Sequence, residues 1–273
     1  EEALQTLATF IGLLTAIQSK LPVFSALLEN TDIHPTRKDF NIISAIIRKI
    51  LDIPELTPEL LTTPLLNETL EEYRKVTEHG RKRDEIKAEI ENGFTKEVLK
   101  INAGPMLAEW NRVSAQWFLP RYFGQRKIKK VIRPYALQPV KPETVQPLLH
   151  QVIRYQEELD FTDRYAAKLP SLFGRFGRDE EWPIIDQIIH EVSSLHSLLL
   201  SYSKDVAKTS RIKQNLALQL TEGIRTFRDI HSHSLNELYQ LVDTLTATEQ
   251  RLSTTLGITV ETLYTNSADW IGI

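Results

Sequence analysis

The residues best suited to bind a charged ligand lie between Trp110 and Pro142, a stretch of 33 positions without one aspartate or glutamate. The candidate site residues in this stretch are basic or aromatic: Arg121, Arg126, Lys127, Lys129, Lys130, Arg133, Trp117, Tyr122 and Phe123. Lysine and arginine neutralise phosphates, and exposed aromatic rings stack on unpaired bases. The composition therefore predicts a nucleic-acid-binding surface, with DNA or RNA as the partner.

Two other interpretations of the same residues stay open. A basic face also binds an acidic protein surface or an anionic membrane. The third interpretation is structural, because tryptophan and phenylalanine at helical spacing are usually buried. In that case Trp110 and Trp117, one heptad apart, anchor the segment in the core beneath a solvated basic face.

Helical spacing predicts how these side chains are presented. At 100° per residue, the lysines and arginines of residues 125–133 fall on one arc. Ile128, Val131 and Ile132 fall on the other arc, and Pro134 stops the pattern. The spacing predicts a short basic amphipathic helix.

Other chemistry is not indicated by the sequence. With no cysteine, the chain has no disulfide, thiol nucleophile or thiolate zinc ligand. A phosphate-loop pattern is missing, and His190 and His196 are six residues apart instead of the four that a helical zinc site requires. We therefore expect no catalytic residue, metal or cofactor among these residues.

Composition limits the class of protein. The chain has 273 residues, 33 basic against 36 acidic side chains, and 41% hydrophobic residues, which excludes a collagen-like or wholly disordered protein. No apolar stretch approaches the roughly 20 residues that span a bilayer. Because Glu1 opens the chain without a basic signal region or an initiator methionine, we expect a cytoplasmic fragment of a longer protein.

The hydrophobic pattern predicts an all-α fold, since apolar residues recur every three or four positions almost throughout. We expect a first helix that Pro22 ends or kinks, a second that Thr36 caps, and a longer one over residues 65–101. Long antiparallel helices, paired as in coiled-coil hairpins, would make the molecule elongated.

The strongest helical pattern runs from Asp205 to Leu256, with Gly257 as a plausible C-cap. If this segment is unbroken, its 52 residues span about 78 Å. Such an apolar stripe must be buried, and residues 65–101 or 142–169 are the expected antiparallel partners.

Two helical segments resemble each other closely enough to suggest an internal duplication. Residues 39–50 and 181–192 share an acidic residue, an aromatic residue and paired isoleucines, with Phe40 and Trp182 in equivalent places. A Lys-Leu-Pro triplet precedes each copy. The expected division is a first helical module (1–102), a basic aromatic connector (103–141), a second module (142–258) and the start of a further unit (259–273).

The connector also carries a family resemblance. The segments Leu107–Trp110 and Trp117–Lys130 resemble the helical insertion of large bacterial superfamily-1 DNA/RNA helicase-like proteins, and the acidic-tryptophan pairs ending in Trp182 and Trp270 fit that pattern. The resemblance implies an ATP-dependent helicase or translocase as the parent, with ATP and magnesium bound by its other domains. Since no ATPase motif lies in these residues, the chain would be a non-catalytic arm that contacts nucleic acid or a partner. The alternative is a coiled-coil scaffold or protein-interaction module without a nucleic-acid role.

Overall fold

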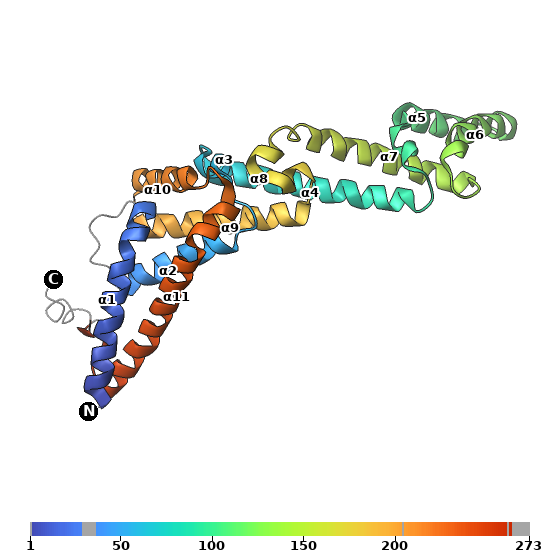
Figure 1. Cartoon of the computed structure of the whole chain (residues 1–273). Coiled ribbons are helices and arrows are strands. Elements are labelled where there is room, and N and C mark those ends of the chain that lie inside the picture. Colours follow the sequence, from blue (N-terminus) through green and yellow to red (C-terminus); the bar gives the residue numbers. More distant parts are fainter. Residues whose placement is uncertain (1, 29–36, 204, 261, 264–273) are drawn as a thin grey trace. The chain divides into compact units, whose positions relative to one another are not determined.

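All regular secondary structure in the described part of the chain is helical. The computed structural model describes residues 2–28, 37–203, 205–260 and 262–263. Over these ranges it contains α-helices and short 3-10 helices and no strand, apart from one isolated bridge between Phe94 and Ala136 (Figure 1). The prediction of an all-α fold is confirmed.

The helices group by contact into two compact units. In chain order they are α1 (Glu2–Leu28), α2 (Arg37–Asp52), α3 (Pro58–Thr62), α4 (Leu66–Glu91), η1 (Lys96–Lys100), α5 (Ala103–Ser114), α6 (Phe118–Ile132), η2 (Arg133–Tyr135), α7 (Pro142–Asp163), α8 (Leu169–Arg178), α9 (Trp182–Ser203), α10 (Val206–Gln219) and α11 (Gly223–Leu256). Unit 1 comprises Glu1–Leu70, Ser171–Gly174 and Gln187–Ile273, and unit 2 comprises Glu71–Pro170 and Arg175–Asp186. The module boundaries expected from the sequence stay a prediction.

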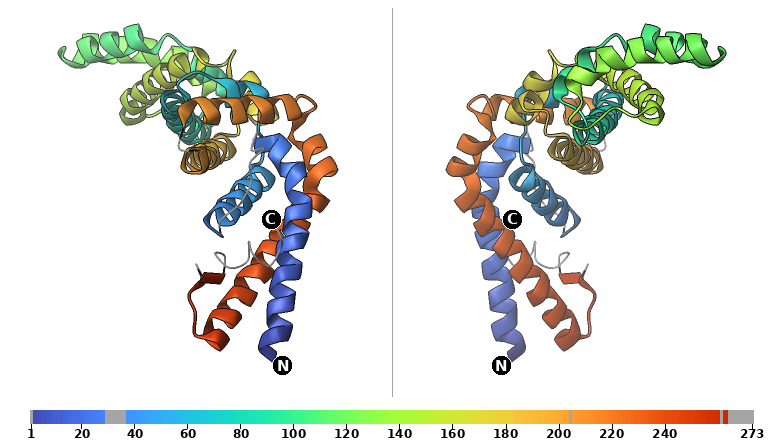
Figure 2. Two further views of the ribbon diagram at one scale, coloured as in Figure 1. Left: turned by 90° about the vertical axis from the view of Figure 1, so that its left-hand side faces the viewer. Right: turned by 90° about the vertical axis from the view of Figure 1, so that its right-hand side faces the viewer.

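In unit 1, α1 runs antiparallel to α11, and Figure 2 shows the two helices beside each other. Lys20 pairs with Glu237, and Arg251 pairs with Glu2 at 2.6 Å. The apolar stripe of α11 is therefore buried against α1, and the expectation that residues 65–101 or 142–169 would cover it is wrong. The physical reason is that α1 has its own buried stripe: Phe10, Leu14 and Ile17.

The predicted single helix over residues 205–256 is also wrong, because the backbone turns between α10 and α11. Leu220 caps α10, and Gly223 begins α11 with φ of +89°, a conformation that glycine adopts without steric cost. Leu216, Leu220 and Ile224 are buried on both sides of the turn, so the apolar spacing continues through it. Gly257 caps α11 in the left-handed conformation, as expected.

Two other expected helix ends differ from the structure. α1 continues through Pro22, whose missing N–H costs the helix one hydrogen bond without ending it. The helix expected to reach residue 101 ends at Glu91, where Asn92 and Gly93 turn the chain. Thr36, the side chain of Phe40 and the segment 264–273 lie outside the described part of the chain, so the duplication stays a prediction.

In unit 2, α4 and α7 lie side by side and antiparallel (Figure 1). Gln151 donates a hydrogen bond to Glu89 at 2.9 Å near one end. His79 bonds Glu158 in the middle, and the rings of Tyr73 and Tyr165 meet edge to face near the other end. From pair to pair, the residue number falls along α4 while it rises along α7 and the residues just after it. The two segments therefore run antiparallel.

A polar network around the buried side chains of Arg83 and Trp182 joins the start of α9 to α4 within unit 2. Arg83 binds Asp84 at 2.8 Å and Glu180 at 2.7 Å, and the Trp182 indole N–H donates to Asp84 at 2.8 Å. The indole ring covers Gly80 so closely that a side-chain carbon there would overlap it. The polar residues in this part of α4 therefore belong to a packed network of side chains.

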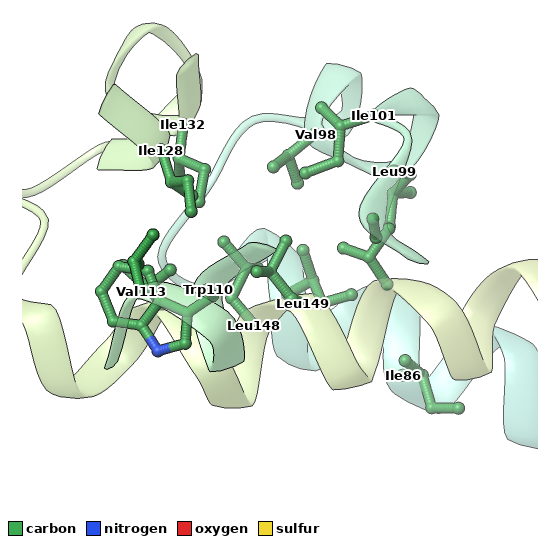
Figure 3. Close-up of a cluster of buried hydrophobic side chains, with 14 residues drawn as sticks. Ile86, Val98, Leu99, Ile101, Trp110, Val113, Ile128, Ile132, Leu148 and Leu149 are labelled. Atoms are coloured by element: carbon green, nitrogen blue, oxygen red, sulfur yellow. The ribbon is translucent and has the colours of Figure 1, made fainter. Parts of the chain in front are cut away.

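A separate hydrophobic cluster holds α5 and α6 against α7 and η1 (Figure 3). Its buried members are Ile86, Ile90, Val98, Leu99, Ile101, Ala103, Trp110, Val113, Ile128, Ile132, Val145, Leu148, Leu149 and Val152. Gln156 donates to the carbonyls of Leu99 and Ile101 at 2.9 and 3.0 Å, which ties α7 to the segment after η1. The cluster fixes the position of the helices that carry the candidate site.

Candidate nucleic-acid interface

α5 and α6 pack closely enough to form one firm support for the candidate residues. A Cβ atom on Gly124 would lie 2.6 Å from Cγ1 of Val113, so only glycine allows this approach of the two helices. Gln125 of α6 donates a hydrogen bond to the Ser114 hydroxyl of α5 at 3.2 Å. Each contact fixes the rotation of α6 about its axis.

The buried face of α6 consists of Ile128 and Ile132, which Figure 3 shows directed toward the hydrophobic cluster. Trp110 of α5 belongs to the same cluster and is buried. Val131, which we expected on this face, is 49% exposed. At 100° per residue it lies about 80° from the direction midway between the two isoleucines, which explains the error.

Four aromatic side chains and one leucine at the start of α6 are exposed instead of buried. Their exposed fractions are 68% for Trp117, 74% for Phe118, 46% for Leu119, 51% for Tyr122 and 62% for Phe123. The core-anchor interpretation thus holds for Trp110 and fails for Trp117. Exposed apolar patches on proteins commonly mark interaction surfaces.

Phe118 was absent from the candidates drawn from the sequence, although four aromatics within seven residues were a usable signal. Its ring faces that of Tyr122, with centroids 6.4 Å apart and planes inclined by 24°. The Tyr122 ring in turn meets Phe123 edge to face at 5.5 Å. The rings contact one another instead of an underlying core.

The candidate cations are available for a ligand. Of the six, Lys129 is half-buried and the other five are exposed. In the described ranges, none of the six forms an ion pair. Arg112 differs, because it binds Glu109 through two hydrogen bonds of 2.8 and 2.7 Å. That contact lowers the pKa of Glu109, with a smaller contribution from the charge of Lys127, and raises the pKa of Arg112.

The structure places every candidate residue on one short segment. Trp117 caps α6, Arg133 opens η2, and the remaining seven lie on α6 itself. We call Trp117–Arg133 the α6 surface. It presents rings at its amino end and cations from Arg121 onward, a combination that suits a ligand with both flat apolar faces and negative charge.

Unit 1 has a hollow that the sequence did not indicate, lined by both apolar and polar side chains. It encloses about 450 Å³ beside the connection from α3 to α4, with His196 of α9 and Lys213 of α10 among its lining residues. Burial lowers the pKa of both side chains, and the charge of Lys213 lowers that of His196 further. Nδ1 of His196 is buried, and no other described residue forms a hydrogen bond with it.

Two structural features are absent among the described residues. No group of three or more histidine, cysteine, aspartate or glutamate side chains there is placed to hold a metal ion. No helix within the same ranges is long and apolar enough to cross a membrane.

Comparison with known proteins adds nothing to the site: no protein-family model, no curated protein and no solved structure matches the chain.

Proposed function

We propose that this chain is a non-catalytic helical arm that contacts nucleic acid through the α6 surface. The observation that carries the proposal is the exposure of four aromatic rings on the same segment as six cations that form no ion pair with another described residue. Phosphates would supply negatively charged partners for these cations, and bases would supply flat faces on which the rings stack.

The scaffold alternative accounts for the long paired helices but not for the surface of α6. A purely structural helix pair gains nothing from leaving Trp117, Phe118 and Phe123 in water, because burying such side chains is favourable by roughly 1.5 to 3 kcal/mol each. A ligand that covers the rings recovers that free energy.

The helicase-like parent is part of the same proposal. Its support is the resemblance of residues 107–130 to the helical insertions of superfamily-1 helicase-like proteins. ATP and magnesium would then be bound by other domains of the parent. A phosphate-loop motif in the flanking sequence of the full-length gene would support this, and flanking sequence without any ATPase motif would contradict it.

Replacing Lys127, Lys129 and Lys130 with glutamine tests the phosphate contacts. We expect the affinity for a fluorescent 20-nucleotide single strand to fall, because fewer phosphates are neutralised. The slope of log K against log salt should become shallower by about 0.7 for each lost contact. Fluorescence anisotropy at several salt concentrations measures both quantities.

The matched control removes the same charge elsewhere by changing the exposed residues Lys75, Lys87 and Lys96 to glutamine. This variant should keep the affinity and slope of the unaltered chain, and circular dichroism should show equal helicity for all three proteins. Undetectable binding at low salt, or equal losses in both triple variants, would refute the α6 surface as the binding site.

A further inference from the structure

Phe118 and Tyr122 present two facing aromatic rings, which the neutralisation of phosphate charge alone would not require. The two residues are four apart on α6, so their side chains lie on the same face of the helix. Their ring centroids lie 6.4 Å apart with the planes inclined by 24°, and the two side chains are 74% and 51% exposed. The pair therefore presents apolar ring surface on which a flat ligand can stack.

The row of side chains at four-residue intervals continues into positive charge and turns by about 120° around the helix axis from Phe118 to Lys130. Phe118, Tyr122, Arg126 and Lys130 follow each other at four-residue intervals, which places two rings and then two cations along about 18 Å of helix. All four are exposed. A strand lying along this stripe would meet ring faces at one end and cations for its phosphates at the other.

We propose that Phe118 and Tyr122 stack on an unpaired base, so that the α6 surface binds single-stranded nucleic acid in preference to duplex. This inference rests on the proposed nucleic-acid contact and adds the ligand class. In a duplex the faces of the bases are already covered by their neighbours, and only base edges are open in the grooves. A duplex thus satisfies the cations and leaves the rings in water.

The test compares the chain with the double variant Phe118→Leu/Tyr122→Leu. Its ligands are a 20-nucleotide thymidine strand, a uridine strand of equal length and a 20-base-pair duplex at one salt concentration. Loss of stacking should weaken single-strand binding by roughly 5- to 150-fold, by the cost of removing one base–ring stack. Duplex affinity and the salt slope should stay unchanged, because the cations are intact.

The control exchanges the two rings, Phe118→Tyr/Tyr122→Phe, and should bind both strands as the unaltered chain does. Since both positions are exposed, both variants should fold, which circular dichroism verifies. Equal affinity of the unaltered chain for strand and duplex would overturn the inference while leaving the proposed function intact. Absence of any nucleic-acid binding would refute both.

A vesicle-binding measurement completes the experiment. If vesicles of mixed phosphatidylserine and phosphatidylcholine bind the unaltered chain and the leucine variant loses that binding while keeping its affinity for single strands, the rings serve a membrane and the inference is wrong. If the leucine variant loses single-strand binding and binds vesicles as the unaltered chain does, the inference is supported. The thymidine and uridine strands separate DNA from RNA as the source of the base.

Discussion

Individual residues in this chain have roles that their type alone does not reveal, and Gly80 is the clearest case. Alanine in place of glycine inside a helix usually stabilises a protein by about 1 kcal/mol. At Gly80 the added methyl group would overlap the Trp182 ring, whose N–H bonds Asp84. We expect Gly80→Ala to lower the free energy of unfolding by about 1 to 3 kcal/mol, as measured by urea denaturation.

Gly12, in the interior of α1, has nothing within 4 Å of its missing Cβ and supplies the control. Gly12→Ala should raise the free energy of unfolding by up to about 1 kcal/mol. Should both substitutions stabilise the chain, the close packing of Trp182 on α4 would be refuted.

Lys213 gives a second prediction at this scale, through its pKa. Burial lowers the pKa of its amine below the unfolded value, so between the two pKa values the unfolded chain binds more protons than the folded chain. The stability of the unaltered protein therefore rises with pH through that window, and the gain is complete above about pH 10.4. Below the folded pKa the charged amine is destabilising by a constant amount.

Lys213→Met removes this penalty while keeping the length of the side chain. We expect the variant to have the higher melting temperature at pH 7 and the difference to shrink as the pH approaches about 10.4. Comparing the two proteins at each pH cancels the titration of all other groups. The exposed Lys75→Met should change stability little at any pH. A variant less stable than the unaltered chain at pH 7 would contradict the prediction.

At the scale of elements, periodicity predicted the helices well and their ends poorly. The apolar spacing between Asp205 and Leu256 was real, yet it continued across the turn between α10 and α11 because Leu220 and Ile224 are both buried. The local signal for the turn was Gly223, a single glycine in a helical pattern. Glycine also occurs inside straight helices here, as Gly12 and Gly80 do, so its type alone did not distinguish a turn from a helix.

Pairing between elements was not predictable from helix length. α1 packs along α11, and α7 packs along α4, through contacts that periodicity alone does not assign to a partner: Lys20 pairs with Glu237, and Gln151 donates a hydrogen bond to Glu89. The polar network of Arg83, Asp84, Glu180 and Trp182 was missed for a similar reason. Arg83 and Asp84 of α4 bind Glu180 and Trp182 at the start of α9 across 97 and 98 positions of sequence, and only the fold brings them together.

At the candidate site, some features were predictable from the sequence and others were not. Charge and aromatic content singled out the segment that forms the α6 surface, and helical spacing placed Ile128 and Ile132 on its buried face. Spacing could not decide between burial and exposure for Trp110 and Trp117, since both fit a helix equally well. What separates them is the hydrophobic cluster, which includes Trp110 and does not include Trp117.

At the scale of the whole molecule, positive charge is concentrated on one segment. The chain carries a formal net charge of −3, and residues 110–142 contribute eight positive charges and no negative ones, so the remaining residues carry −11. A polyanion is attracted to that segment and repelled by the remainder, and the summed field steers its approach. Nucleic acid should therefore occupy a single region of the chain.

Cross-linking tests this expectation on the intact chain. After ultraviolet irradiation with a thymidine strand at about 0.15 M salt, where charges more than about 8 Å apart are largely screened, mass spectrometry should find cross-linked peptides within residues 110–142. Phe118 and Tyr122 should be among the modified residues, because they lie against the base. The variant with Lys127, Lys129 and Lys130 changed to glutamine should give fewer cross-links at the same positions and none elsewhere, since its remaining surface is net negative. Cross-links spread over α1 or α11 would mean that binding does not follow the charge of the molecule, and the α6 surface would then be only one of several contacts.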